Sequence, residues 1–408
     1  MWSAPGCMWA LMHGQDCPPI DPAGQVRDYT VSMSNAGTES RREWTNHSRA
    51  SFRRGVMRWY LRERRAMPWR AEPGALGDPY HVLVSELMLQ QTQVATVIDY
   101  FNRFIEAFGS IAELAAADEQ DVLRLWQGLG YYRRARHLHA AAKQIVAEHG
   151  GQIPGEMDAL LALPGVGRYT AGAIASIAFG RAEPIVDGNV SRVFARLTAI
   201  DEPIDRGDVK LRLWDEAREL VSGAARAAGY GPGDLNQAMM ELGAMVCTPR
   251  GPQCLLCPVR RQCAAYERGE PELYPVAAAR RAPRAVVHRV MAVRRGGRYL
   301  FQQRGDDGLW SGMWQLPTLE DARSENVGNP EAWFAQRFGM QLERGEMVER
   351  FTHMTTHRKI AFEVWAAEVR GGRLRPRTGQ WRGLDDVGDL PMANPQRRVV
   401  KVLRDRQA

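Results

Sequence analysis

The chain has 408 residues, which is enough for two or three domains with a sizeable buried core. Hydrophobic residues make up 45% and charged residues 25%, as in an ordinary globular protein, and no apolar run reaches the roughly 18–20 residues of a membrane-spanning helix. This composition excludes a helical membrane protein. The net charge of +7 and the pI of about 9.2 favour an acidic partner such as nucleic acid.

The first 50 residues differ from the rest of the chain. They are rich in Gly, Pro, Ser, Asn and Asp and show no periodicity, so we predict a disordered extension over 1–50. A start codon assigned too far upstream would explain them equally well. The segment lacks a basic stretch followed by a clean apolar core, and it therefore does not resemble a signal peptide.

Residues 51–246 show a helical pattern, with apolar residues recurring at intervals of three and four. Residues 264–285 are rich in Pro, Ala and Arg and are interpreted as a linker. Beyond the linker the hydrophobic period changes to two, which predicts strands over 286–293, 298–304 and 359–369, with a helix over 330–338. We therefore predict an all-α domain followed by a smaller α+β domain over 286–408.

A glycine turn interrupts the helical region in "LPGVGRYTAG". Gly165 suits a tight turn, and Gly167 allows a ligand to approach the backbone closely. The helix that follows presents unsatisfied N–H groups and its dipole at the same point, so the motif fits a DNA phosphate. An ordinary corner between two helices explains the turn as well.

Two carboxyl groups in different surroundings suggest acid–base chemistry. Glu86 lies in the otherwise apolar run "PYHVLVSELMLQQTQV", where burial should raise its pKa. Asp187 lies at a predicted helix N-cap in "PIVDGNVSRV", where helix N–H groups should keep it ionised. Such a pair supplies both a proton donor and an anion. Asp187 could instead be only a helix cap.

Four of the six cysteines crowd into one short stretch, with the spacing C-x6-C-x2-C-x5-C, while Cys7 and Cys17 lie near the N-terminus. The uneven distribution indicates a reducing compartment rather than a disulfide framework. One loop supplying four thiolates suits a [4Fe–4S] cluster, and zinc is the alternative. The four candidate ligands over 247–263 are Cys247, Cys254, Cys257 and Cys263.

Six features together resemble the MutY family of adenine DNA glycosylases: "SELMLQQTQV", "GLGYYRRAR", "LPGVGRYTAG", "PIVDGNVSRV", "NQAMMELGAMVC" and the cysteine spacing. The resemblance covers residues 52–263 and extends more weakly into the C-terminal domain. It implies a helix-hairpin-helix glycosylase domain with a [4Fe–4S] loop, followed by a Nudix-like domain. It also implies that the protein binds double-stranded DNA carrying adenine opposite 8-oxoguanine or guanine.

The resemblance assigns roles to the catalytic candidates. Glu86 is the general acid that protonates the adenine, Asp187 stabilises the oxocarbenium-like sugar, either Glu86 or Tyr169 assists the water, and Asn189 orients the group. In the similar endonuclease III family a lysine matches Tyr169, and its amine attacks the sugar. A phenol cannot form that Schiff base, so the sequence predicts base removal without strong strand cleavage.

Further residues match family positions that contact the DNA or the extruded base. Tyr131 resembles the residue that stacks beside the lesion, and Leu129 of the same loop is a candidate for the wedge that base extrusion needs. The aromatic side chains of this loop could instead form core, with its arginines on a solvated face. Gln91 and Thr92 resemble residues that fill the gap left by the base. Three positions match the surroundings of the adenine pocket, although Trp69 could be a core residue: Trp69, Arg70 and Gln237.

In the C-terminal domain, Phe351, Thr352 and His353 resemble the Phe-Ser-His loop with which the family inspects 8-oxoguanine. A hydroxyl or carbonyl oxygen can accept the hydrogen that 8-oxoguanine carries on N7 and guanine lacks. These residues could instead be ordinary strand-end positions. The domain lacks the acidic helix REUxEExGU of an active Nudix hydrolase, so we predict lesion recognition without nucleotide hydrolysis.

The sequence therefore predicts a monomeric adenine DNA glycosylase of base excision repair, located in the cytoplasm with the nucleoid. An endonuclease III-like lyase acting on oxidised pyrimidines is the alternative enzyme, and Tyr169 argues against it. A DNA lesion sensor without turnover is the alternative outside enzymes, and the presence of both Glu86 and Asp187 argues against it.

Overall fold

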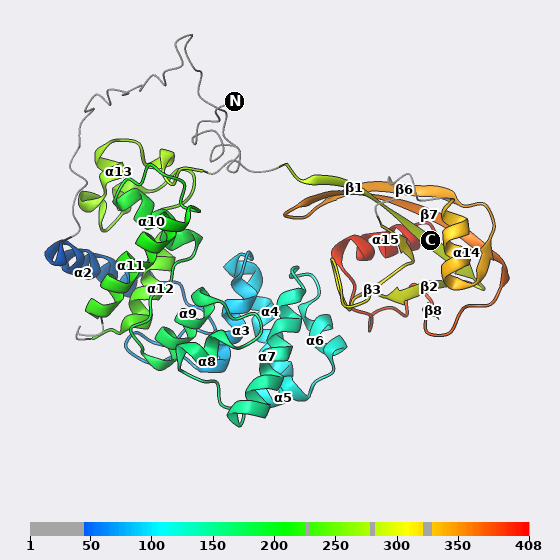
Figure 1. The fold of residues 1–408 in the computed structure, drawn as a ribbon, viewed down its shortest axis with the longest axis horizontal. Coiled ribbons are helices and arrows are strands. Elements are labelled where there is room, and N and C mark those ends of the chain that lie inside the picture. The colour runs from blue at the N-terminus through cyan, green and yellow to red at the C-terminus, as the bar shows by residue number, and fades with distance from the viewer. Residues whose placement is uncertain (1–44, 225–228, 278–281, 321–328, 408) are drawn as a thin grey trace, which may run out of the picture. The chain divides into compact units, whose positions relative to one another are not determined.

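The computed structural model describes residues 45–224, 229–277, 282–320 and 329–407. The predicted N-terminal extension lies outside these residues up to position 44, and the first helix, α2, begins at Asn46, inside the segment expected to be disordered. Figure 1 shows a helical region followed along the chain by a region built around a sheet, as the two hydrophobic periods predict.

The helical region carries short and medium helices separated by tight turns (Figure 1). Its helices are α2 (Asn46–Glu63), α3 (Pro79–Leu89), α4 (Val94–Ala107), α5 (Ile111–Ala116), α6 (Glu119–Trp126), α7 (Arg133–His149), α8 (Met157–Leu161), α9 (Arg168–Phe179), α10 (Gly188–Leu197), α11 (Gly207–Ala224), α12 (Pro232–Met245) and α13 (Ala264–Glu267). Local sequence sets their starts. Asp78, for example, caps α3 by accepting the His81 N–H, and Pro79 occupies the first turn, where its missing N–H costs nothing.

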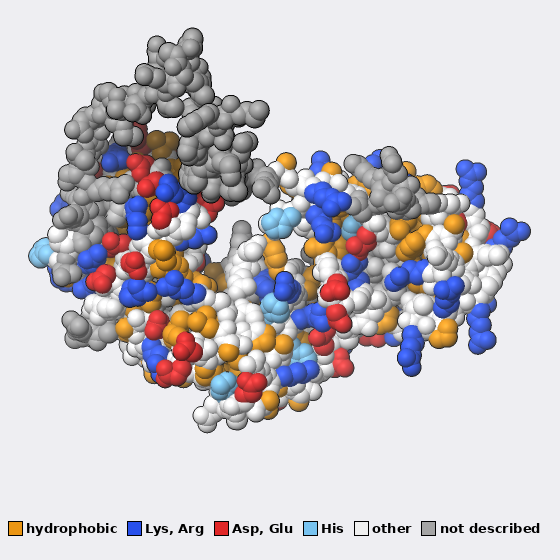
Figure 2. All heavy atoms as spheres, in the orientation of Figure 1, with side chains coloured by type: hydrophobic (Ala, Val, Ile, Leu, Met, Phe, Trp, Pro, Cys, Tyr) orange, Lys and Arg blue, Asp and Glu red, His pale blue; other side chains and the backbone are white. Residues whose placement is uncertain are grey.

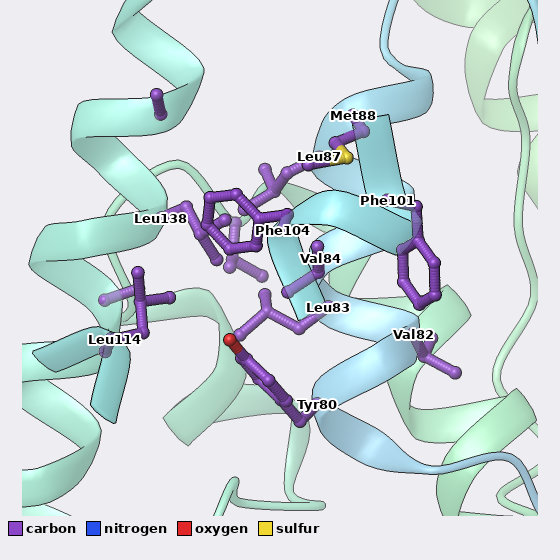
Figure 3. Packing of buried hydrophobic residues seen from close by; sticks show 14 of the residues in the cluster. Tyr80, Val82, Leu83, Val84, Leu87, Met88, Phe101, Phe104, Leu114 and Leu138 are labelled. Atoms are coloured by element: carbon purple, nitrogen blue, oxygen red, sulfur yellow. The ribbon is translucent and has the colours of Figure 1, made fainter. Parts of the chain in front are cut away.

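Two hydrophobic clusters hold the helical region together. The first cluster is built on α3, α4, α7 and α9, and Figure 3 shows Leu83 and Leu87 of α3 close to Phe104 of α4. The second cluster is built on α2 and α10–α12, with Phe52 and Phe194 fully buried. Met240 packs against both clusters, so α12 is the place where the two halves of the region meet.

The cysteine segment and the start of the predicted linker belong to the helical region. Short 3₁₀ turns at Cys254–Leu256 and Arg260–Gln262 carry the cysteine loop, and η3 (Pro271–Leu273) follows α13. Ala265 is completely buried against Ala199 and Tyr274. The prediction of a linker over 264–285 is therefore wrong for its first half, 264–274, because Ala265 and Tyr274 pack against Ala199, just after the end of α10.

The C-terminal region is a mixed sheet with β1 and β7 parallel at its centre and the other strand pairs antiparallel. Its strands are β1 (Arg284–Arg295), β2 (Arg298–Gln303), β3 (Trp314–Gln315), β4 (Thr318–Leu319), β5 (Met340–Leu342), β6 (Glu346–Met354), β7 (Arg358–Gly372) and β8 (Gln380–Arg382). The strands predicted over 286–293 and 359–369 are confirmed within β1 and β7, and the strand predicted over 298–304 is confirmed as β2 except for its last residue.

Two helices cover opposite faces of this sheet. Successive strand residues point to opposite faces, so Val290 of β1 packs with α15 (Asn394–Asp405), and the neighbouring Met291 packs with α14 (Pro330–Phe338). Phe362 of β7 lies on the α15 face, completely buried. The sheet is thus covered by a helix on each face, and the predicted helix over 330–338 is confirmed as α14.

Acidic and basic side chains are interspersed on the face shown in Figure 2, so the excess positive charge is not gathered there in one block. In the part of the chain that the structure describes, every helix is too short or too polar to cross a membrane.

Candidate active site

A cavity of about 470 Å³ lies beside α12, with walls from both halves of the helical region. Nine residues that the sequence singled out line it, although they come from five separate stretches of chain: Trp69, Arg70, Glu86, Gln91, Thr92, Tyr169, Asp187, Asn189 and Gln237. A cavity that collects scattered polar candidates in this way is the expected form of an active site.

Glu86 is the most perturbed acid in the cavity. It lies on the buried side of α3 and is 4% exposed. Burial raises the pKa of Glu86 to about 7. The charge of Asp187 adds to this rise, and the hydrogen bond from Tyr169 opposes it. The sequence prediction of a raised pKa is confirmed. A carboxyl with this pKa is half protonated near neutral pH and can donate a proton to a bound group.

Tyr169 fixes one oxygen of that carboxyl. Its hydroxyl donates to Glu86 Oε2 at 2.7 Å and lies 3.1 Å from Met240 Sδ. Burial and the charge of Glu86 raise the pKa of Tyr169 well above its usual range, so the phenol stays protonated. Tyr169 therefore orients Glu86 as a hydrogen-bond donor and does not itself act as an anion.

Asp187 is the N-cap of α10, as the sequence predicts. Asp187 Oδ1 accepts the Val190 N–H at 2.7 Å, and Oδ2 accepts from Asn189 Nδ2 at 2.9 Å. Arg192 donates in turn to Asn189 Oδ1 at 2.8 Å, which fixes the orientation of the amide. Burial nevertheless raises the pKa of Asp187, and the helix N–H, Asn189 and Arg192 oppose that rise. The hydrogen bonds from the helix N-terminus and from Asn189 act in the direction that the sequence predicts, towards the ionised form, while desolvation acts against them.

The opposite wall of the cavity is a network of charged and amide groups. Arg70 Nε donates to Gln237 Oε1 at 3.0 Å. Glu241 accepts from Arg65 Nε at 2.8 Å and from Arg70 Nη2 at 3.3 Å. These guanidinium groups lower the pKa of Glu241 although its carboxyl is buried. Because Gln237 uses its oxygen in this network, its NH₂ group remains for another partner.

Sequence reasoning missed Arg65 and Glu241, although both line the cavity. The signal was present for Glu241, an acid within the apolar run "NQAMMELGAMVC", which is the same signal that singled out Glu86. For Trp69 the two interpretations coincide. Its ring packs edge-on against Phe101 at 5.1 Å and also lines the cavity.

The residues predicted to contact DNA differ in their exposure. Gln91 and Thr92 are at least partly exposed, and Gln91 has a positive φ of 58°. Tyr131 is 48% exposed, also with a positive φ. Leu129 is 7% exposed and packs in the first hydrophobic cluster, so the structure favours the core interpretation of this residue. Arg134 is buried and donates to the carbonyl oxygens of Leu87 and Met88, closing the end of α3.

The glycine turn before α9 has the predicted geometry. Gly165 has φ of +77°, and a Cβ there would lie 2.6 Å from His137 Cβ, so the turn also needs a glycine for packing. Gly167 is the N-cap of α9, and a Cβ there would meet no atom within 4 Å. The open backbone at Gly167 is consistent with the predicted phosphate contact.

The four cysteines of the loop are free thiols, each half-buried. Arg196 crosses the loop and donates to Cys247 Sγ at 3.3 Å and to the Thr248 carbonyl at 2.7 Å. Burial raises the pKa of Cys257 to about 12, and the charges of the other three cysteines add to the rise. Among the described residues, no three His, Cys, Asp or Glu side chains form a group suited to a single metal ion.

The three predicted lesion-reading residues lie on β6. Phe351 is 7% exposed, whereas Thr352 is exposed and His353 is half-buried beside Trp310. Phe351 and His353 point to the same face of the sheet, and Thr352 points to the other. The sequence offered ordinary strand-end positions as the alternative to a reading loop, and the structure places all three residues in the last part of β6, which ends at Met354.

Comparison with known proteins agrees with this architecture. The family described as "HhH-GPD superfamily base excision DNA repair protein" matches residues 84–219, and the NUDIX domain family matches residues 289–402. The chain is 35% identical over 412 residues to adenine DNA glycosylase from Mus musculus, covering 87% of this chain and 78% of that protein.

The chain belongs to the adenine DNA glycosylase family. The human adenine DNA glycosylase is 33% identical over 453 residues, covering 96% of this chain and 81% of its own length. The relative from Schizosaccharomyces pombe is 31% identical over 380 residues. The predicted class is thus confirmed: the protein is a DNA glycosylase of base excision repair with a helix-hairpin-helix domain and a Nudix-like domain.

Proposed function

We propose that this glycosylase hydrolyses the N-glycosidic bond of adenine paired with 8-oxoguanine or guanine. One observation carries the proposal. Glu86 lies in a cavity with Asp187 and Tyr169, and its pKa of about 7 suits a general acid at neutral pH. A base must leave the helix to enter such a cavity, so the reaction requires base flipping.

The proposed roles follow from the contacts. Protonated Glu86 gives its proton to N7 of the adenine, so that the base departs neutral. Asp187, held by the α10 N-terminus and by Asn189, stabilises the positive charge that develops on the sugar. This arrangement resembles the pair of carboxyl groups used in glycoside hydrolysis. Tyr169 keeps Glu86 Oε2 in place, and Glu86 then serves as the base for the attacking water.

The network on the opposite wall suits recognition of the base. Trp69 offers a flat apolar surface, and Gln237 offers the NH₂ group that Arg70 leaves unused. An amide NH₂ can donate to a ring nitrogen of adenine. Arg65 and Glu241 hold Arg70 and thereby Gln237 in one orientation.

The lining of the cavity supports base removal without strand cleavage. Tyr169 stands where the similar endonuclease III family carries its lysine, and the lining includes none of the four lysines of the chain: Lys143, Lys210, Lys359 and Lys401. A Schiff base needs an amine near the sugar. The lyase on oxidised pyrimidines is therefore the weaker proposal.

We also propose a [4Fe–4S] cluster at Cys247, Cys254, Cys257 and Cys263. Four free thiols in one loop are a suitable donor set, and the guanidinium of Arg196 already points to the sulfur of Cys247, where it would stabilise a thiolate. When bound, the cluster would brace the loop. Arg250, Arg260 and Arg261 of that loop are suited to DNA phosphates, with no part in bond breaking.

The C-terminal domain is proposed to read the base opposite the adenine through Phe351, Thr352 and His353. Thr352 is exposed on β6 and its hydroxyl can accept the N7 hydrogen of 8-oxoguanine. The protein would act as a monomer on chromosomal DNA, in the cytoplasm with the nucleoid.

Single-turnover assays on labelled duplexes, each with and without alkali, test the function. One duplex carries adenine opposite 8-oxoguanine, and another carries an oxidised pyrimidine. We expect product from the first, mainly after alkali. Direct nicking of the second would favour the lyase, and tight binding without product from either would favour a lesion sensor.

A further inference from the structure

Two exposed residues of the helical region have an unusual backbone conformation. Gln91 has a φ of 58° and Tyr131 has a φ of 48°, which places both in the left-handed region that residues with a side chain seldom adopt. Gln91 also lines the cavity that holds Glu86. Strained turns persist only where other contacts fix them, and a single side chain provides such contacts to both turns.

Arg134 of α7 is that side chain, and it is buried, with 7% of its surface exposed. Its Nη2 donates to Thr92 Oγ1 at 3.1 Å and to the Gly130 carbonyl oxygen at 3.1 Å. Thr92 directly follows Gln91 in the sequence, and Gly130 directly precedes Tyr131. One nitrogen atom of Arg134 therefore bridges the two strained turns.

The rest of the guanidinium group fixes Arg134 itself. Its Nη1 donates to the carbonyl oxygens of Leu87 at 2.9 Å and Met88 at 2.8 Å, at the end of α3. Its Cζ lies 5.5 Å from the ring centroid of Trp126 and 5.4 Å from that of Tyr131. Arginine carries donors on separate nitrogen atoms in one plane. A lysine has a single nitrogen atom, which can take the place of Nη1 or of Nη2 but not of both.

We propose that Arg134 is a positioning residue for extrusion of the adenine, because it holds the turns of Gln91 and Tyr131 in one arrangement. An extruded base leaves a gap in the duplex, and side chains that enter the gap keep the base from returning. Both residues are exposed, and Gln91 lies at the cavity that receives the base. Arg134 is buried and acts through the two turns. The proposal rests on the proposed function, in which the adenine leaves the helix to reach Glu86.

His139 offers a matched control on the same helix. It is 1% exposed, and its Nε2 lies 3.1 Å from the carbonyl oxygen of Ala117. His139 and Arg134 are thus both buried polar side chains of α7 that contact a backbone carbonyl. Ala117 lies outside both strained turns, so His139→Ala removes a buried hydrogen bond of α7 without touching either turn.

Hydrogen exchange in the protein without DNA tests whether Arg134 holds both turns. The Thr92 and Leu129 N–H groups each donate at 3.1 Å to a carbonyl oxygen three residues earlier, so these two amides report on the two turns. Arg134→Lys should speed exchange at both amides about 10-fold, as expected for the loss of a hydrogen bond from a charged group, and His139→Ala should change neither. Faster exchange at only one of the two amides, or at neither, would overturn the bridge.

Thr92→Val provides a second variant, in which Arg134 stays in place. It removes the hydroxyl acceptor at one end of the bridge, so exchange at the Thr92 amide should become faster. Adding Arg134→Lys should then cause no further change at this amide, because both substitutions remove the same hydrogen bond. Additive accelerations would show that other contacts hold this turn, and they would overturn the bridge.

The fluorescence of 2-aminopurine tests whether the bridge serves extrusion. The duplex carries 2-aminopurine in place of the adenine opposite 8-oxoguanine, and its fluorescence rises when the base leaves the stack. Saturating Glu86→Gln protein, which lacks the general acid, should extrude the base without excising it. Adding Arg134→Lys should lower the rise about 3-fold or more, and adding His139→Ala should leave it unchanged. An unchanged rise with Arg134→Lys, or an equal fall with His139→Ala, would overturn the role in extrusion.

The exchange measurement needs no substrate, so it separates the bridge from the proposed function. If the unmodified protein excises no adenine while both amides exchange faster in Arg134→Lys, the bridge stands and the proposed function fails. If the unmodified protein excises adenine and neither amide responds to Arg134→Lys, the proposed function stands and the bridge fails.

Discussion

The two walls of the active-site cavity each bury a glutamate, and they treat the two carboxyls in opposite ways. Glu86 on α3 meets a phenol and apolar side chains, and its pKa rises to about 7. Glu241 on α12 meets the guanidinium groups of Arg65 and Arg70, and its pKa falls. Exposure does not distinguish them, since they are 4% and 2% exposed. The nearest partner decides whether a buried acid is a proton donor or a fixed anion.

The opposite pKa shifts of Glu86 and Glu241 suit one wall of the cavity to catalysis and the other to recognition of the base. A neutral partner leaves Glu86 free to gain and lose a proton during the reaction, at a cost to stability. Cationic partners keep Glu241 ionised, and the resulting network orients Gln237. Substituting Glu by Gln on each wall should therefore give results of opposite sign.

The largest expected effect is on catalysis at the first wall. Glu86→Gln should lower the single-turnover rate on adenine opposite 8-oxoguanine by about 10³-fold or more, since a general acid contributes about 10²–10⁴-fold and Glu86 serves twice. Binding of the same duplex should persist in a filter or anisotropy assay. Near-normal excision would remove Glu86 from the acid role.

The second effect is on stability at the opposite wall. Glu241→Gln should lower the free energy of unfolding at pH 7 by about 3 kcal/mol, because it leaves the buried Arg70 without its counter-charge. Because the pKa of Glu241 is lowered in the folded protein, its ionised carboxylate stabilises the fold at pH values above the ordinary pKa of a glutamate. The loss of stability caused by Glu241→Gln should therefore shrink as the pH falls below that value. Denaturant unfolding at pH 4 and pH 7 measures it. An equal loss at both pH values would contradict this account.

The third effect has the opposite sign. Glu86→Gln should raise the free energy of unfolding above pH 7 by about 3 kcal/mol, since each pKa unit corresponds to about 1.4 kcal/mol. As the pH rises from about 4.5 to 7, Glu86 ionises in the unfolded chain but stays protonated in the folded protein. The unmodified protein therefore loses stability over this pH range. At low pH, Gln and protonated Glu should be equally stable. Denaturant unfolding of both proteins over this pH range measures the difference. If Glu86→Gln were less stable than the unmodified protein at pH 8, the ionised Glu86 would be a stabilising anion like Glu241.

The smallest effect concerns the hydrogen bond between Tyr169 and Glu86. The excision rate should fall as the pH rises through about 7, because Glu86 must be protonated to donate. The Tyr169 hydroxyl lowers the pKa of Glu86, so Tyr169→Phe should move this fall to higher pH. A pH–rate profile of both proteins under single-turnover conditions measures the shift. A fall that moves to lower pH would show that the phenol stabilises the protonated carboxyl.

Short-range sequence patterns were enough to predict much of the fold and most residues of the candidate site. The change of hydrophobic period predicted the helical and the strand regions, and an Asp directly before a helix start predicted the N-cap at Asp187. The linker boundary was predicted too early, since the packing of Ala265 depends on Ala199, which is distant in sequence.

By itself the sequence determined which residues could do chemistry: an acid in an apolar helix, an acid at a helix start, a glycine turn and four crowded cysteines. Only the tertiary structure decided their partners. The phenol of Tyr169 reaches Glu86 across 83 positions of sequence, and Arg65 reaches Glu241 across 176. It also buried Leu129 and turned Phe351 inward. The reason is physical: a pKa or an orientation depends on atoms within a few ångströms, and folding alone brings those atoms together.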